Sequence, residues 1–205
     1  MIRYKSVEKE AHAEQVIERS RFIAHIRPCT GREEAEEYIR SIKARYKDAT
    51  HNVPCFIVGE KQELMWASDD GEPAGTSGAP MMQMLSREGL TNLVCVVTRY
   101  FGGIKLGTGG LVRAYTSSAR MALDAAVIHE VRDIRSVRMN VPYTLLGKLQ
   151  NMEQNSPFVI SGTEYSDCVT LTLNFAPEDE GLVMPQIVEM TAGKPDIISV
   201  ENFLE

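Results

Sequence analysis

The sequence predicts an α+β protein of two domains, and three observations lead to this prediction. Strand-like apolar runs and helix-like periodicities alternate along the 205 residues, of which 43% are hydrophobic and 24% charged. The final third has the element order βαββαβ, which is the ferredoxin-like arrangement. Acidic and basic residues balance over residues 1–134, so the net charge of −6 belongs to the rest of the chain. We therefore expect one domain over residues 1–132 and a ferredoxin-like domain over residues 136–205.

The elements of the first domain follow from spacing and turn residues. Strands are expected around residues 4–8 and over residues 21–26. A Thr30–Glu33 capping pattern precedes apolar residues at helical spacing, which predicts a helix over residues 32–46. A Gly-Glu-Lys turn predicts a hairpin formed by strands over residues 53–58 and 62–67. Pro80 suits the first turn of a helix that ends near Gly89. An apolar run then predicts a fully buried strand over residues 92–100.

A long helix should follow, and the remaining elements make up the second domain. Leu111, Ala114 and Tyr115 begin the packing stripe of that helix, whereas Arg113 and Arg120 project from its opposite face. Ser166-Asp167 forms the turn of a hairpin in the second domain. Its strands are expected over residues 136–141, 158–165, 168–175 and 197–203, with helices over residues 144–154 and from residue 177 onward.

Composition excludes several classes of protein. The first residues contain no apolar leader, and no run approaches about eighteen apolar residues, so we expect a cytoplasmic protein without a membrane association. The four cysteines are widely separated and lack zinc-ligand spacing. We therefore expect thiols in place of disulfides, and neither a metal nor another cofactor.

The most informative segment is a glycine-rich loop between the predicted strand over residues 92–100 and the long helix. It concentrates five of the fifteen glycines, and a helix that starts after it would direct free N–H groups and its positive dipole end at the loop. Such a loop suits an anion, although a tight strand-to-helix connection would also use glycine. No acidic residue lies between Glu88 and Asp124, so the basic side chains create a positive field. The candidate binding residues of this segment are Arg99, Gly102, Gly103, Lys105, Gly107, Thr108, Gly109, Gly110 and Arg113.

The loop matches neither of the two common phosphate-binding motifs. A Walker A loop requires Lys and then Ser or Thr after its second glycine, but Thr108 and Gly109 follow Gly107. A dinucleotide fingerprint requires a glycine where Val112 stands. Nucleotide binding is therefore not specifically indicated.

A second polar segment, over residues 68–78, contains three carboxylates: Asp69, Asp70 and Glu72. They could hold a hard cation or supply a base, or they could cap backbone N–H groups in an Asx-type turn. His51 is either a hydrogen-bonded loop histidine or part of a site. We expect residues 69–78 to lie beside the glycine loop, because the two segments bracket adjacent elements of one domain.

Two stretches resemble a known family. DDGEPAGTSGAP over residues 69–80 and VTRYFGGIKLGTGGLVRAY over residues 97–115 are similar to the signature of the IMPACT/YigZ family, and Phe22 and His51 fall where the family carries such residues. The resemblance implies a ribosomal-protein-type α/β sandwich followed by a ferredoxin-like domain. Eukaryotic relatives act in translational control and use an additional N-terminal domain, which we do not expect in this chain. The resemblance therefore implies an association with translation, but the partner of those relatives cannot be carried over.

Three functions remain open, and we favour the first. It is a non-enzymatic module that binds RNA, the ribosome or another polyanion through the glycine loop. The second is an enzyme acting on a phosphorylated small molecule, with Asp69, Asp70 or Glu72 beside the loop and His51 as acid or base. The third is a protein-interaction regulator whose anchors are Arg99, Tyr100 and Phe101.

Overall fold

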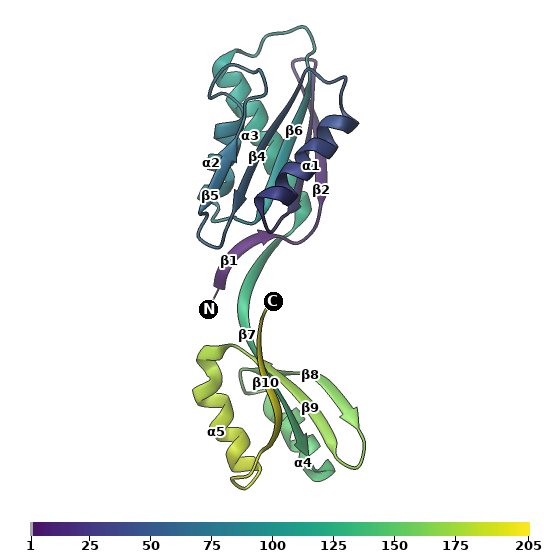
Figure 1. Cartoon of the computed structure of the whole chain (residues 1–205), viewed down its shortest axis with the longest axis vertical. Coiled ribbons are helices and arrows are strands. Elements are labelled where there is room, and N and C mark those ends of the chain that lie inside the picture. The colour runs from purple at the N-terminus through teal and green to yellow at the C-terminus, as the bar shows by residue number, and fades with distance from the viewer. Residues whose placement is uncertain (1) are drawn as a thin grey trace. The chain divides into compact units, whose positions relative to one another are not determined.

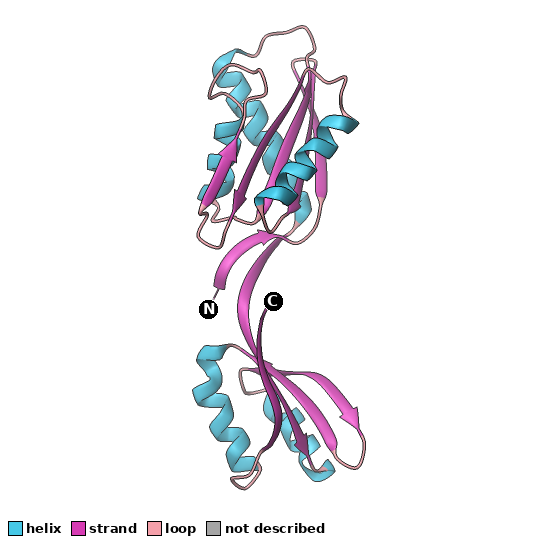
Figure 2. Cartoon of the chain, viewed as in Figure 1, coloured by secondary structure: helices cyan, strands magenta, loops and turns pink. Residues whose placement is uncertain are grey.

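The computed structural model describes residues 2–205, which divide into two compact units (Figure 1). The N-terminal unit spans Tyr4–Glu130, and the C-terminal unit spans Val131–Glu205 together with residues 2 and 3. Each unit combines one sheet with helices, as the colouring by secondary structure makes plain (Figure 2). The predicted α+β class is confirmed.

The N-terminal unit is built on a five-stranded sheet in which every neighbouring pair is antiparallel. The central strands are apolar on both faces, which explains their continuous hydrophobic runs. In sheet order the strands are β2 (Ala11–Ile17), β3 (Ser20–Pro28), β6 (Leu93–Tyr100), β4 (His51–Val58) and β5 (Leu64–Ala67).

Helices cover both faces of this sheet. Helix α1 (Arg32–Arg45) packs on one face against Phe56 and Val58 of β4. Helices α2 (Gly78–Arg87) and α3 (Gly107–Ala126) pack on the other face, where the alternate residues of β4 point. The main core therefore lies between the sheet and α3, and the start of α3 is anchored beside the end of β6.

The C-terminal unit has the predicted order of strands and helices. Its elements are β7 (Ile128–Val141), α4 (Tyr143–Glu153), β8 (Phe158–Tyr165), β9 (Val169–Phe175), η1 (Pro177–Asp179), α5 (Glu180–Met190) and β10 (Asp196–Leu204). Strand β10 pairs with β7, which is followed across the sheet by β9 and β8, and β1 (Ile2–Val7) lies next to β7 in the same sheet. Helices α4 and α5 close one core with Leu149, Val183 and Ile187.

Several elements differ from the predictions for physical reasons. Strand β2 was not predicted, because its partly buried face carries Ala11, Ala13 and Gln15 before Ile17 and produces little apolar alternation. Helix α3 begins at Gly107, inside the predicted loop, since tertiary packing overrides the low helix propensity of glycine. The predicted Thr30–Glu33 capping box is wrong: Thr30 donates from its N–H to Glu34, at 2.8 Å.

The structure also describes the four cysteines and the lengths of the helices. Cys29, Cys55 and Cys95 are buried free thiols, and Cys168 is a partly exposed one. Among the described residues, no helix is both long and apolar enough to cross a membrane.

Candidate functional site

The candidate site begins where β6 ends. Thr50 holds this end from the neighbouring strand, since its N–H donates to the Arg99 carbonyl at 2.9 Å and its Oγ1 accepts from the Phe101 N–H at 3.0 Å. The chain then passes so close to the backbone of Arg19 that a Cβ on Gly102 would overlap it. Gly102 is therefore required by close backbone approach.

Helix α3 begins directly after the loop and has an open N-terminus. Its N-cap residue is Leu106, whose side chain cannot accept a hydrogen bond, and its first turn contains no acidic residue. Gly107 has a φ of 70°, a conformation that favours glycine. Free N–H groups at such a terminus, together with the helix dipole, attract an anion.

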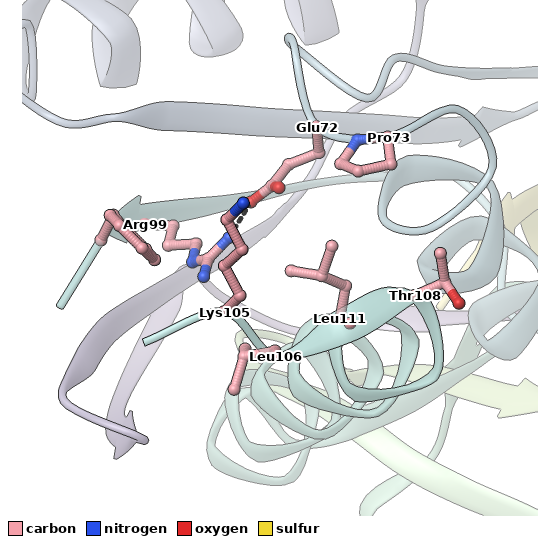
Figure 3. A pocket seen from close by; sticks show the side chains of 9 residues that line it. Glu72, Pro73, Arg99, Lys105, Leu106, Thr108 and Leu111 are labelled. Atoms are coloured by element: carbon pink, nitrogen blue, oxygen red, sulfur yellow. Dashed lines mark hydrogen bonds and ion pairs between the residues drawn. The ribbon is translucent and has the colours of Figure 1, made fainter. Parts of the chain in front are cut away.

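A pocket of about 380 Å³ lies between this helix terminus and the acidic segment (Figure 3). The expectation that residues 69–78 lie beside the glycine loop is confirmed, because Glu72 and Pro73 line the same pocket as residues 105–108. Nine residues line it: Glu72, Pro73, Arg99, Phe101, Lys105, Leu106, Gly107, Thr108 and Leu111.

A buried network forms one wall of the pocket. Glu72 Oε1 accepts hydrogen bonds from Arg99 Nη1 at 2.6 Å and from the Tyr115 hydroxyl at 2.7 Å. His51 Nε2 lies 3.8 Å from the same oxygen. Burial, and then the hydrogen bond to Glu72, raise the pKa of Tyr115. The Tyr115 hydroxyl therefore stays protonated and acts as a donor.

Arg99 is held from several sides. Its guanidinium lies over the rings of Phe22 and Phe101, 5.4 and 5.3 Å from their centroids. Nη2 donates to Ser20 Oγ at 3.3 Å, whereas the buried Nε has no hydrogen-bond partner within the described part of the chain. Arg99 is thus an internal cation paired with Glu72, and it is not available as the exposed protein-binding anchor that the sequence suggested.

The other carboxylates of the acidic segment are engaged with the backbone. Asp69 accepts from the N–H groups of Gly75, Ser77 and Gly78 and from the Ser77 hydroxyl at the start of α2. Burial alone would raise its pKa, but these hydrogen bonds outweigh burial and lower it. This arrangement matches the capping alternative for Asp69.

Asp70 and His51 also make local contacts. Asp70 accepts from the Asn52 N–H at 2.7 Å and from Lys43 Nζ at 2.5 Å. His51 Nδ1 lies 2.8 Å from the Asp70 carbonyl oxygen, a hydrogen bond that orients the ring toward Glu72. Over residues 2–205, no group of three or more His, Cys, Asp or Glu side chains is arranged to hold a metal ion.

The basic residues near the loop fall into different environments. Lys105 is exposed at the pocket, and Arg113 is exposed at a second pocket of about 500 Å³, which shares Lys105 and Leu106 with the first. Arg120, in contrast, pairs with Glu88 at 2.8 Å and with Asp124 at 3.4 Å. Arg120 therefore does not contribute a free charge, because Asp124 lies one turn further along the same helix and folding brings Glu88 to it.

The remaining predicted residues lie around the pocket but outside its lining. The Tyr100 hydroxyl donates to Asp48 at 3.0 Å. Gly103 has a φ of 88° in the loop, while Gly109 and Gly110 are part of the first turns of α3. These glycines shape the backbone, and Gly110 also lines the second pocket.

Sequence reasoning missed Tyr115 and Ser20 as members of the site. Tyr115 was assigned to the packing stripe of the long helix, where it does lie, but its hydroxyl reaches Glu72. The available signal was chemical: a tyrosine on an otherwise apolar helix face needs a partner for its hydroxyl when it is buried. Nothing in the sequence pointed to Ser20.

Comparison with known proteins agrees with this architecture. The Impact N-terminal domain matches residues 18–123, and a domain of unknown function (DUF1949) matches residues 139–194. The chain thus combines the two domains of a two-domain α+β protein. It belongs to the IMPACT family.

Similar proteins cover almost the whole chain. IMPACT family member YvyE of Bacillus subtilis is 39% identical over 194 residues, which cover 95% of this chain and 89% of that protein. IMPACT family member YigZ of Escherichia coli is 29% identical, with 91% and 92% covered. A crystal structure of a hypothetical protein aligns with a TM-score of 0.60 and 27% identity over 97% of both chains.

Proposed function

We propose that this protein is a non-enzymatic, translation-associated protein that binds RNA, free or within the ribosome, through the pocket at the N-terminus of α3. One observation carries the proposal: the uncapped start of α3 and the exposed Lys105 face the same pocket. Free N–H groups at a helix terminus and a lysine ammonium both favour a phosphate group.

The charges around the pocket also favour an anion. Glu72 would repel phosphate if its charge were uncompensated, but Arg99 neutralises it at 2.6 Å. Lys105 and Arg113 form no ion pair among residues 2–205, so their charges are available to a ligand. Glu18 also lines the second pocket, so the side chains of the two pockets comprise three cations and two carboxylates, and the net local charge is positive.

The association with translation is supported by family membership. The Impact N-terminal domain matches residues 18–123, and the family resemblance implies a role in translational control, which would place the protein in the cytoplasm. A phosphate-binding surface on such a protein is best explained by RNA, the phosphate polymer that the translation machinery presents.

Binding fits the pocket better than catalysis of a reaction on a phosphorylated small molecule. Asp69 and Asp70 have their oxygens engaged by backbone N–H groups and by Lys43, and Glu72 by Arg99 and Tyr115. Thr108 supplies the one hydroxyl among the nine residues that line the pocket, and it makes no hydrogen bond to a base within residues 2–205, so a hydroxyl nucleophile with an adjacent base is missing from that lining.

The proposal is tested by measuring RNA affinity against salt concentration. Each phosphate contact contributes about 0.7 to the slope for single-stranded RNA, so Lys105→Ala should reduce the slope by about that amount and Lys105→Ala/Arg113→Ala by about twice as much. Arg120→Ala is the matched control, since Arg120 is already paired with Glu88 and Asp124. It should leave the slope unchanged.

If the wild-type protein shows no salt-dependent RNA binding tighter than about 10⁻⁴ M, the weak end of non-specific affinity, the RNA function is excluded. A protein partner would then be the better explanation for the exposed ring of Phe101.

A further inference from the structure

We infer that the pocket at the start of α3 holds one unpaired nucleotide, with its phosphate at the first turn of the helix and its base against Phe101. The inference rests on the proposed RNA function and narrows it. It replaces a general affinity for polyanions with recognition of a nucleotide whose base is free of pairing.

The phosphate half of the pocket is formed by α3 and the residue before its cap. Leu106 provides no capping side chain, and the Thr108 hydroxyl has no hydrogen-bond partner in the described part of the chain. Lys105 extends from the loop into the same pocket toward Glu72, whereas Thr108 lies on the other side of Leu111 (Figure 3). These groups are all donors, and a phosphate supplies only acceptors.

The other half of the pocket is lined by apolar side chains. Pro73, Leu106 and Leu111 line it together with Phe101, whose ring remains 46% exposed. Exposed aromatic rings are the surfaces on which unpaired bases stack. A ligand that carries only a phosphate would leave this half unused.

Arg99 adds a second observation that points to a ligand. The Arg99 side chain is only 5% exposed, and it lines the pocket. Its Nε–H has no hydrogen-bond acceptor among residues 2–205. A buried donor without a partner is costly. Base edges and the ribose carry acceptors that would give the Arg99 Nε–H the partner it lacks.

The size of the pocket and its neighbour favour a single strand. A volume of about 380 Å³ is near the lower end of the range of about 300–1,000 Å³ for ligand pockets, enough for one nucleotide but not for a base pair in a duplex. The second pocket, with Arg113, shares Lys105 and Leu106 with the first. A strand that leaves the first pocket can therefore continue across these two residues, where Arg113 meets the next phosphate.

The test measures the binding of three RNAs of equal length to the whole chain: a single strand, the same strand with abasic sites, and a blunt-ended duplex. Because stacking on an aromatic ring strengthens binding by about 5-fold to 150-fold per base, the single strand should bind at least about 5-fold more tightly than the abasic strand or the duplex. Fluorescence anisotropy at several salt concentrations measures this.

Variants separate the two halves of the pocket. Phe101→Ala should remove the preference for the single strand over the abasic strand without changing the salt slope, because the ring carries no charge. Phe101→Trp should retain the preference. Met121→Ala is the matched control, an exposed apolar residue further along α3, and should change neither quantity.

Each outcome decides the inference. Equal affinity for the normal and abasic strands would overturn the nucleotide pocket while leaving the proposed RNA function intact. Absence of salt-dependent binding to all three RNAs would overturn both. Tighter binding of a free nucleoside monophosphate than of the single strand would assign the pocket to a soluble nucleotide and overturn its assignment to RNA.

Discussion

Glu72 and Arg99 form an ion pair that is almost completely shielded from solvent. Arg99 Nη1 lies 2.6 Å from Glu72 Oε1, and the two side chains are 5% and 4% exposed, respectively. They come from different segments, the loop before α2 and the end of β6. The pair therefore ties the acidic segment to the sheet at the wall of the pocket.

Removing the acidic partner should strongly destabilise the N-terminal unit. We expect Glu72→Ala to reduce the free energy of unfolding by about 3–5 kcal/mol, because it leaves the Arg99 charge buried without a partner and the Tyr115 hydroxyl without an acceptor. Urea unfolding monitored by circular dichroism measures the loss.

Two further variants control for the effect of the charge. Tyr115→Phe removes only one hydrogen bond and should cost about 0.5–1.5 kcal/mol. Replacing Glu72 and Arg99 together by methionine should recover most of the stability lost in Glu72→Ala, since no unpaired charge remains. A loss below about 1 kcal/mol in Glu72→Ala would mean that the pair behaves as a solvated surface pair.

Gly102 is expected to be the least replaceable glycine of the loop. A Cβ at this position would overlap the carbonyl group of Arg19, and the Gly102 N–H donates to Ser20 Oγ at 3.2 Å. Gly102→Ala should therefore displace the loop, lower the melting temperature and weaken RNA binding. Gly109→Ala is the matched comparison: its Cβ would meet only Arg113 Nη1 at 3.6 Å, and an alanine that fits the existing backbone should raise the free energy of unfolding by about 0.4–1 kcal/mol. Equal melting temperatures for the two variants would contradict this account.

Asp69 should make the protein less stable in acid. Hydrogen bonds at the start of α2 lower the pKa of Asp69 below its ordinary value of 3.8. A carboxyl group with a depressed pKa contributes stability that is complete above the unfolded value and is lost as the pH falls through the folded value. Unfolding curves between pH 5 and pH 2 should thus show a smaller decrease for Asp69→Asn than for the wild type. An identical decrease would assign the acid sensitivity to other carboxylates.

His25 should produce a second pH dependence at higher pH. Burial, and then the nearby His12 and Arg45, lower the pKa of His25 from 6.5 to about 4, and its Nε2 has no partner among the described residues. As the pH falls, His25 therefore binds a proton in the unfolded chain before it does so in the folded protein. The free energy of unfolding should thus decrease from pH 6.5 to pH 4, by up to about 1.4 kcal/mol for each pH unit.

The measurement is chemical unfolding at several pH values in this interval. His25→Leu should flatten the dependence, whereas His129→Gln, a change in β7 away from this core, should not. A His25 ring that titrates near pH 6.5 by nuclear magnetic resonance would contradict the prediction.

Much of the fold was predictable from local pattern. Strands β4 and β6 are buried on both faces, so their apolar runs were visible without any knowledge of neighbours. The order βαββαβ and the helical spacing of α1 and α3 were also visible, because periodicity is a property of the chain itself. Strand β2 was invisible by the same reasoning, since its partly exposed face carries polar residues and its pairing with β3 is a tertiary contact.

The candidate site was predictable only in part. The sequence by itself determined that glycines, basic residues and carboxylates occur in two segments, and that residues 69–80 and 97–115 resemble one family. Only the tertiary structure decided which charges are free: Arg99 is paired with Glu72 and Arg120 with Glu88, whereas Lys105 and Arg113 remain exposed. The physical reason is that a side chain's charge acts through its burial and its partners. Those partners lie 27 and 32 positions away along the chain and meet only when the sheet and its helices are packed.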